Sequence, residues 1–191
     1  AKRCIFWVPI RQIPTAICNL KDTPLKRKNH KELAMNDIII TDFGPQHFEQ
    51  ALDVLYESNC MHARCDNKQF ICAPKENSVP YVRSVLEDEN KFGFVALDNN
   101  IVAGILFGGV LERDENIYCN RRFCKVFDIA VSSKYTKRGI GKQLINAAAE
   151  YARSRNVRQI ELEVFSFNTN AEAFYKRLNF REVSRIMSLE V

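Results

Sequence analysis

A turn between Lys134 and Leu144, with the sequence KYTKRGIGKQL, carries residue types that bind phosphate. Its two glycines let the backbone approach a ligand without a Cβ atom in the way. An apolar pattern of helical spacing follows, so unpaired N–H groups and the positive end of a helix dipole would face the ligand. Lys137, Arg138 and Lys142 add positive charge. The turn predicts a phosphate-bearing ligand, and ATP, a dinucleotide and coenzyme A are the alternatives.

The spacing around the glycines argues against two of these ligands. A P-loop has the pattern GxxxxGK[ST], in which a hydroxyl group binds magnesium, whereas Gln143 follows the Gly-Lys pair here. A dinucleotide turn needs a third glycine for close helix packing, and Leu144 stands at that position. Seven residues also separate Val131, at the end of a predicted strand, from Gly139. Coenzyme A remains.

The elements that must position this turn follow from periodicity and turn residues. We predict a loop over 61–77 and a hairpin over 91–115 with its turn at 98–100. The predicted strands cover 38–43, 121–131, 157–165 and 180–191, and the predicted helices cover 45–60, 78–90, 139–155 and 169–178. This order is typical of an α/β fold, in which a central mixed sheet has helices on both faces.

The charge of the chain is unevenly placed. Residues 1–34 hold eight of the 28 Lys and Arg residues but two of the 23 Asp and Glu residues. We therefore expect 1–34 to be a basic N-terminal extension, and the functional domain to cover 35–191. The near-neutral domain gives no reason to expect a nucleic-acid partner. Its apolar run IVAGILFGGVL has eleven residues, too few to span a bilayer, so no membrane partner is expected either.

The seven cysteines are odd in number and form no CxxC pair. This usage predicts unpaired thiols in a cytoplasmic protein. Cys60, His62, Cys65 and Cys72 lie close together in the sequence, but their spacing matches no paired set of zinc ligands. We therefore expect no metal site.

Two segments place the glycine turn in a wider context: VFDIAVSSKYTKRGIGKQLINAAAEYA and IELEVFSFNTNAEAFYKRLNF. Together they resemble the GCN5-related N-acetyltransferase (GNAT) superfamily, and they are similar to uncharacterised bacterial GNAT acetyltransferases. The positions that match the family pattern are Val131, Gly139, Gly141, Asn168, Ala171, Tyr175 and Phe180. The resemblance covers 35–191 and implies the GNAT acyl-CoA acyltransferase fold, with acetyl-CoA as co-substrate.

The resemblance also implies where the coenzyme binds. Contacts are expected at the end of the 121–131 strand, in the glycine turn and on the 169–178 helix. The residues implied are Ile129, Ala130, Val131, Lys137, Arg138, Gly139, Ile140, Gly141, Lys142, Asn168, Ala171 and Tyr175. Three positions depart from the family pattern: Thr136 replaces Gln or Arg, and Lys137 and Asn179 replace Gly. The first two departures affect contacts with the pyrophosphate, and Asn tolerates the left-handed conformation at the third.

The implied reaction assigns roles to a few side chains. Tyr175 is the family's general acid for the leaving thiolate, and the N–H groups of Ile129 and Val131 would stabilise the oxyanion. The amine must lose a proton before it attacks. Glu163, Asp128 or a chain of waters are the alternatives for the base.

The function most consistent with this pattern is transfer of an acetyl group from acetyl-CoA to a primary amine of a small molecule, by direct attack in a ternary complex. A protein N-terminal or lysine acetyltransferase is the first alternative. A non-catalytic module that binds coenzyme A is the second. The expected state is a monomer or a homodimer.

Overall fold

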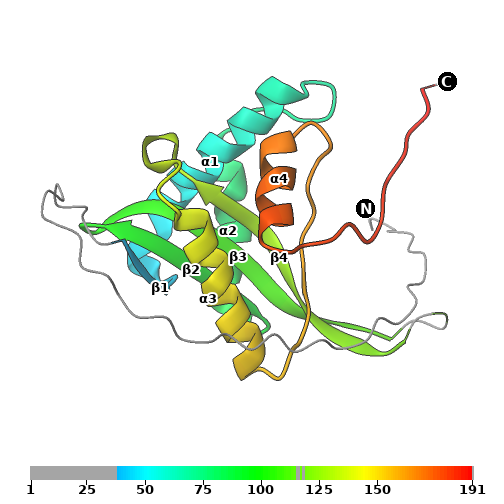
Figure 1. Cartoon of the computed structure of the whole chain (residues 1–191). Helices are drawn as coiled ribbons and strands as arrows, with labels where there is room; N and C mark the ends of the chain where they lie inside the picture. Colours follow the sequence, from blue (N-terminus) through cyan, green and yellow to red (C-terminus); the bar gives the residue numbers. More distant parts are fainter. Residues whose placement is uncertain (1–37, 115–116, 118, 191) are drawn as a thin grey trace, which may run out of the picture.

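A five-stranded sheet forms the centre of the computed structural model, which describes residues 38–114, 117 and 119–190. The expected extension at 1–34 and the expected start at Met35 lie outside the described residues. The strand order is β1-β2-β3-β4-β5, and Figure 1 labels the first four strands. The strands are β1 (Ile39–Asp42), β2 (Lys91–Asp98), β3 (Ile101–Arg113), β4 (Arg121–Val131) and β5 (Ile160–Glu161). The first four pair antiparallel and β5 pairs parallel with β4, so the sheet is mixed, as predicted.

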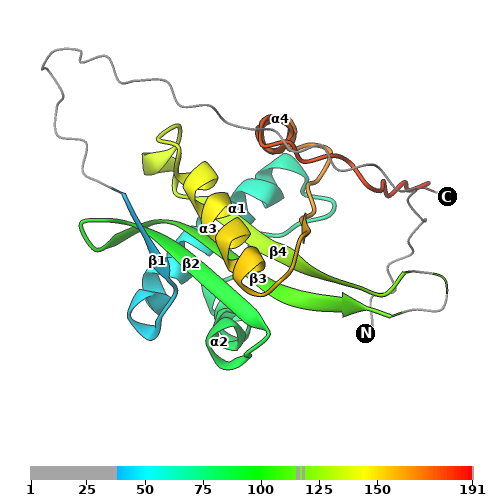
Figure 2. The same cartoon turned by 60° about the horizontal axis from the view of Figure 1, so that its bottom comes forward.

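Helices cover both faces of the sheet, which confirms the predicted layers (Figure 2). On one face α1 and α2 bury their apolar sides against the central strands. On the other face α3 does the same, and α4 adds Tyr175 to that core. None of the helices in the described part of the chain has the length and apolar character needed to cross a membrane. The helices are η1 (Pro45–His47), α1 (Phe48–Cys65), η2 (Lys75–Ser78), α2 (Val79–Glu87), η3 (Ser133–Tyr135), α3 (Ile140–Ser154) and α4 (Thr169–Arg177).

Several predicted turns and caps are confirmed by the backbone. Asn99 and Asn100 both have positive φ, at 50° and 68°, as the turn between β2 and β3 requires. The side chain of Asn168 accepts a hydrogen bond from the N–H of Ala171 (3.2 Å), so it caps α4. Asn179, just after α4, has a φ of 66°. This is the left-handed conformation expected at a position where the family pattern has Gly.

The prediction of a loop from residue 61 is wrong, because α1 continues to Cys65. The segment Met61–Cys65 holds neither Gly nor Pro, and the helix ends where Asp66 and Asn67 begin a turn. The side chain of Asp66 accepts hydrogen bonds from the backbone N–H groups of Lys68 and Gln69 (3.2 Å each), which competes with continuing the helix.

Two predicted strands also differ from the structure. Of the strand expected over 157–165, only Ile160–Glu161 pairs with β4. The strand expected over 180–191 is absent from the described residues 180–190. Phe180 packs against Tyr175, and residues 181–190 are exposed and extend away from α4 (Figure 1). The short β5 and the missing last strand are related, because a strand of two residues has almost no free edge with which a further strand could pair.

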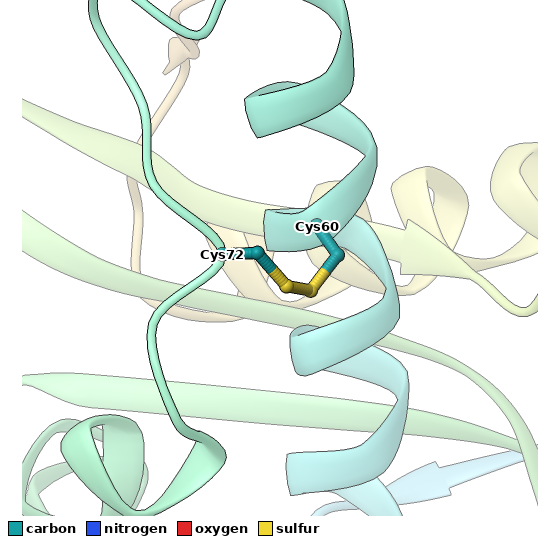
Figure 3. The surroundings of a disulfide bond; sticks show 2 residues. All are labelled: Cys60 and Cys72. Carbon is teal, nitrogen blue, oxygen red and sulfur yellow. A yellow bond between two sulfur atoms is a disulfide. The ribbon is translucent and has the colours of Figure 1, made fainter.

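The expectation of unpaired thiols is wrong for Cys60 and Cys72, which form a disulfide bond (Figure 3). Cys60 lies in the penultimate turn of α1, and the following loop runs back beside the helix, so the two Cα atoms are 4.5 Å apart. A separation of twelve residues in the sequence does not reveal this contact. Among the described cysteines Cys65 and Cys119 are free and exposed, and Cys124 is free and buried.

Candidate functional site

The strands β4 and β5 separate shortly after they meet. Their pairing consists of Cys124 with Ile160 and Lys125 with Glu161. Beyond Lys125, β4 continues to Val131 and pairs along its other edge with β3. Within the described residues, this last part of β4 therefore has an edge that no neighbouring strand covers, with backbone groups available to a ligand.

A β-bulge at Phe127 determines which side chains face that region. Adjacent residues of β3 pair with Val126 and Asp128, so Phe127 is the extra residue. Before the bulge, Val126 packs into the core beneath α3. After it, Ala130 packs into the core beneath α1 and α2, and Asp128 contacts Tyr81 of α2. Regular alternation would have placed Asp128 on the α3 face, so the bulge re-aims this carboxylate.

The bulge also sets the direction of the backbone N–H groups. The N–H of Ser132 donates to the carbonyl of Ala103 on β3 (3.0 Å). Because N–H directions alternate along a strand, those of Ile129 and Val131 point away from β3, towards the uncovered edge. The N–H of Ala130 points towards β3, and its side chain is buried. Of the three predicted positions, Ile129 and Val131 can therefore donate to a ligand at this edge.

Asp128 lies in a half-buried polar environment. The hydroxyl group of Tyr81 donates a hydrogen bond to its carboxylate. Burial raises the pKa of Asp128, while the Tyr81 hydrogen bond and the nearby His62 charge act in the opposite direction. Burial lowers the pKa of His62, and the charge of Asp128 opposes that shift. Burial and the neighbouring carboxylate raise the pKa of Tyr81, so its phenol stays protonated and remains a donor.

Glu163 has different surroundings. It lies two residues after β5, and its side chain is exposed. Glu161, the last residue of β5, is buried and accepts hydrogen bonds from Arg121 (2.5 Å) and Gln159 (3.0 Å). The structure therefore brings Asp128 together with titratable partners, and leaves Glu163 in solvent.

The glycine turn forms the N-terminus of α3. Gly139 is the N-cap with a φ of 79°, a conformation that strongly favours Gly. The N–H groups of Lys142 and Gln143 bond to the Gly139 carbonyl, so those of Ile140 and Gly141 have no partner within the helix. A Cβ atom on Gly141 would lie 3.2 Å from the ring of Phe174. This glycine therefore permits close packing of α3 against α4.

The cationic side chains of the turn are not equivalent. Lys137 and Lys142 are exposed. Arg138 pairs with the buried Asp98 (3.2 Å) and lies over the ring of Tyr135, 5.3 Å from its centroid. The guanidinium of Arg138 thus ties the turn to the end of β2. Lys137 and Lys142 are the predicted cations whose side chains remain available to a phosphate.

Tyr175 lies in the core between α3 and α4. Its ring contacts those of Phe174 (5.2 Å between centroids) and Phe180 (5.6 Å). Burial raises the pKa of Tyr175 to about 12, so its hydroxyl group stays protonated at neutral pH. Because Phe174 also packs over Gly141, the α4 residues Ala171 and Tyr175 belong to the same region as the glycine turn.

Sequence reasoning missed Tyr81 and His62 as neighbours of Asp128. The expected loop contained His62, but the residue lies on α1, seven positions after the buried Leu55 and so on nearly the same helix face. A helical pattern extended by one turn would have found it. No local signal identifies Tyr81, since its contact with Asp128 joins residues 47 positions apart.

Comparison with known proteins agrees with this architecture. The model of the Acetyltransferase (GNAT) family matches residues 38–180. An uncharacterised N-acetyltransferase of Methanocaldococcus jannaschii is 40% identical over 90 residues, which are 47% of this chain and 34% of that protein. An uncharacterised N-acetyltransferase of Bacillus subtilis is 32% identical over 63 residues, 33% of this chain and 40% of that protein. The matched segments thus span less than half the length of these curated relatives.

Solved structures share the fold. A Bacillus halodurans protein, BH1408, superposes with a TM-score of 0.73 at 20% identity, over 80% of this chain and 99% of that one. An aminoglycoside N-acetyltransferase, AAC(6')-Iy, solved in complex with CoA, superposes with a TM-score of 0.66 at 16% identity, over 84% and 99% of the two chains. At such identities the likeness concerns the fold alone.

Proposed function

Because the chain belongs to the acetyltransferase (GNAT) family, we propose that it transfers an acetyl group from acetyl-CoA to a primary amine of a small molecule, by direct attack in a ternary complex. The observation that carries the proposal is the placement of Asp128 beside the uncovered edge of β4, to which Ile129 and Val131 direct their N–H groups. Aminoglycoside N-acetyltransferases with the same fold, one of them solved with CoA, support this reaction class.

The residues present fit the pyrophosphate of coenzyme A. The unpaired N–H groups of Ile140 and Gly141 lie at the positive end of the α3 dipole. The exposed cations Lys137 and Lys142 flank them. Arg138, which is bound to Asp98, keeps the turn in place and is a positioning residue in this proposal. Asn168 and Ala171 form the start of α4 beside the same turn.

Asp128 is the base in this proposal. An alkylamine with a pKa of about 10.4 is mostly charged at neutral pH, so a proton acceptor is needed before the nitrogen can attack. Burial raises the pKa of Asp128 towards the working pH, which improves its match to this task. The exposed Glu163 has no such environment. A chain of waters leading to Asp128 is compatible with the same role.

The remaining steps stabilise the acetyl oxygen by hydrogen bonds and protonate the sulfur that leaves. Bound acetyl-CoA supplies a thioester, whose C–S bond breaks as the C–N bond forms. The N–H groups of Ile129 and Val131 donate to the acetyl oxygen as it gains negative charge. Tyr175 gives its phenolic proton to the departing sulfur, and its raised pKa of about 12 ensures that the proton is present.

We place the reaction in the cytoplasm as part of the proposal. Three described cysteines, Cys65, Cys119 and Cys124, are unpaired, which supports a reducing compartment. The bond between Cys60 and Cys72 is the contrary observation, since disulfides are typical of oxidising compartments. Thiol labelling of the protein isolated from its own cells distinguishes a reducing from an oxidising compartment, because Cys60 and Cys72 react with the label only when the bond between them is reduced.

The test of the function is release of free coenzyme A from acetyl-CoA against a panel of small amines and a panel of peptides. We expect turnover with small amines. Turnover on peptides alone would replace the proposal with a protein acetyltransferase. Calorimetric binding of coenzyme A without turnover on any acceptor would show a non-catalytic binding module.

A further inference from the structure

Four aromatic side chains from separate segments form one cluster. His62 comes from α1, Phe70 from the loop after it, and Phe165 and Phe167 from the segment between β5 and α4. Phe70 meets Phe165 edge-on at 4.7 Å between centroids, and Phe165 stacks on Phe167 at 5.7 Å. The His62 ring lies 5.5–5.9 Å from each of the other three. We call these four residues the aromatic cluster.

All four rings are half-buried, so each keeps part of its surface open to solvent. The end of α1 and the segment leading into α4 lie side by side, which brings the rings together (Figure 1). Half-exposed aromatic rings gathered from two distant parts of a chain offer a surface for an apolar ligand.

The aromatic cluster lies next to Asp128. Lys125 and Glu161 are the last pair of β4 and β5, and Asp128 and Phe165 follow them by three and four residues. Both residues therefore lie where the two strands have separated. After the bulge Asp128 faces the α1 and α2 layer, and His62 lies on the face of α1 that carries the buried Leu55. The charges of His62 and Asp128 also influence each other's pKa, as expected for groups on this shared face.

Three carboxylates of α1 and its following loop, those of Asp53, Glu57 and Asp66, bind other partners. Asp53 pairs with Lys75 (2.7 Å), and Glu57 accepts a hydrogen bond from the N–H of Ser133 (2.9 Å). Asp66 accepts from the backbone of its own turn. Asp128 is the carboxylate whose charge acts on His62, so the aromatic cluster has a half-buried acidic group beside its rings.

From this combination we infer that the acceptor is a monoamine carried on an aromatic or similarly apolar body. The inference rests on the proposed function and names its substrate class. The body packs against the aromatic cluster, and the amine reaches Asp128. Burial of a benzyl-sized group removes roughly 150–250 Å² of surface from water. The ring faces also attract the ammonium group before it loses its proton.

The same surroundings disfavour acceptors with several charges. A polyamine or an aminoglycoside would bring additional ammonium groups to a surface of phenyl rings. Each of them would lose hydration without gaining a carboxylate partner. The acceptor class inferred here therefore differs from that of the aminoglycoside N-acetyltransferases that share the fold.

The test compares 2-phenylethylamine, putrescine and kanamycin as acceptors in the coenzyme A release assay. We expect kcat/KM to be at least about tenfold higher for 2-phenylethylamine, as hydrophobic discrimination in a binding site allows. In Phe167→Ala this preference falls by about tenfold, with the KM for acetyl-CoA unchanged. Ile71→Ala, which alters an exposed apolar side chain beside Phe70, is the matched control and keeps the preference.

The conservative variant Phe167→Leu is a control for misfolding of Phe167→Ala, because it keeps an apolar side chain and removes only the ring. It should show normal circular dichroism and an intermediate loss. Preference for putrescine or kanamycin would overturn the inference and leave the proposed function intact. A preference for a peptide with N-terminal phenylalanine over the free amine would overturn the inference too, and would also favour a protein acetyltransferase over the proposed function.

A binding measurement separates the two proposals if no amine is turned over. 2-Phenylethylamine is titrated calorimetrically into protein saturated with coenzyme A. Binding that is lost in Phe167→Ala supports the acceptor class even though the catalytic proposal has failed. Absence of binding overturns the acceptor class.

Discussion

The hydroxyl group of Tyr81 on α2 donates a hydrogen bond to the carboxylate of Asp128 on β4. This contact joins the helix layer to the strand on which the acetyl group is proposed to react. It exists because the bulge at Phe127 turns Asp128 towards α2. The hydrogen bond fixes the direction of the carboxylate, while burial raises its pKa. Both effects suit a base that must take a proton from an ammonium group.

Replacing Asp128 with Asn should lower kcat by about 100-fold or more, the usual contribution of a general base. The amide still accepts the hydrogen bond from Tyr81 but cannot take up a proton. The affinity for acetyl-CoA should not change. Steady-state kinetics with a responsive amine measure both quantities. The control is Glu163→Gln, at an exposed position, with near-normal kcat. A large loss in the control and none in Asp128→Asn would assign the base to Glu163.

The same variant should change the pH dependence of stability. Burial raises the pKa of Asp128 in the folded state above its ordinary value of 3.8, so the folded state holds this proton more tightly than the unfolded chain. That contribution is fully present below pH 3.8 and is lost as pH rises through the raised pKa. Asn does not titrate. Urea unfolding should find Asp128→Asn more stable than the unmodified protein at pH 7 to 8, with a smaller difference near pH 4. A difference independent of pH would contradict the burial argument.

Tyr175→Phe should reduce kcat by about 100-fold if the phenol protonates the departing sulfur. The ring contacts with Phe174 and Phe180 remain, so the thermal midpoint should stay close to that of the unmodified protein. Phe174→Leu serves as the control, because it alters packing in the same helix and removes no acid. Full kcat in Tyr175→Phe would limit Tyr175 to a packing role.

The parts of the fold that could be predicted from the sequence have local causes. Asn99 and Asn100 tolerate positive φ, and Gly139 adopts it without strain, so each marks a turn regardless of what surrounds it. Asn168 caps α4 through a hydrogen bond to a residue three positions away. Such signals need no knowledge of the tertiary structure.

The features that escaped prediction depend on distant parts of the chain. The bulge at Phe127 is defined by its register against β3, and it decides which face Asp128 occupies. The bond between Cys60 and Cys72 requires the loop to run back along α1. The strand expected over 180–191 needed a neighbour, and β5 pairs over only two residues. In each case the local pattern is compatible with more than one arrangement.

Lys137→Gly should stabilise the fold by about 1 kcal/mol, because Lys137 has a φ of 63° and a residue with a Cβ atom is strained in that conformation. The control is Lys134→Gly, which removes a lysine from η3, where glycine adds only flexibility. Both variants lose one positive charge, so the difference between them isolates the backbone effect. Urea unfolding at moderate salt measures it. Equal stability of the two variants would show that the turn relaxes around Lys137.

Cys60→Ser should lower the free energy of unfolding by about 3 kcal/mol, the cost of releasing a loop of this length. The bond also holds the loop that carries Phe70, two residues before Cys72, against α1. The KM for the acceptor amine should therefore rise, while the KM for acetyl-CoA stays constant. Cys65→Ser removes an exposed free thiol and should change neither value. With dithiothreitol present, the unmodified protein should match Cys60→Ser in both measurements. If Cys60→Ser equals the unmodified protein without reductant, the bond contributes neither to stability nor to acceptor binding.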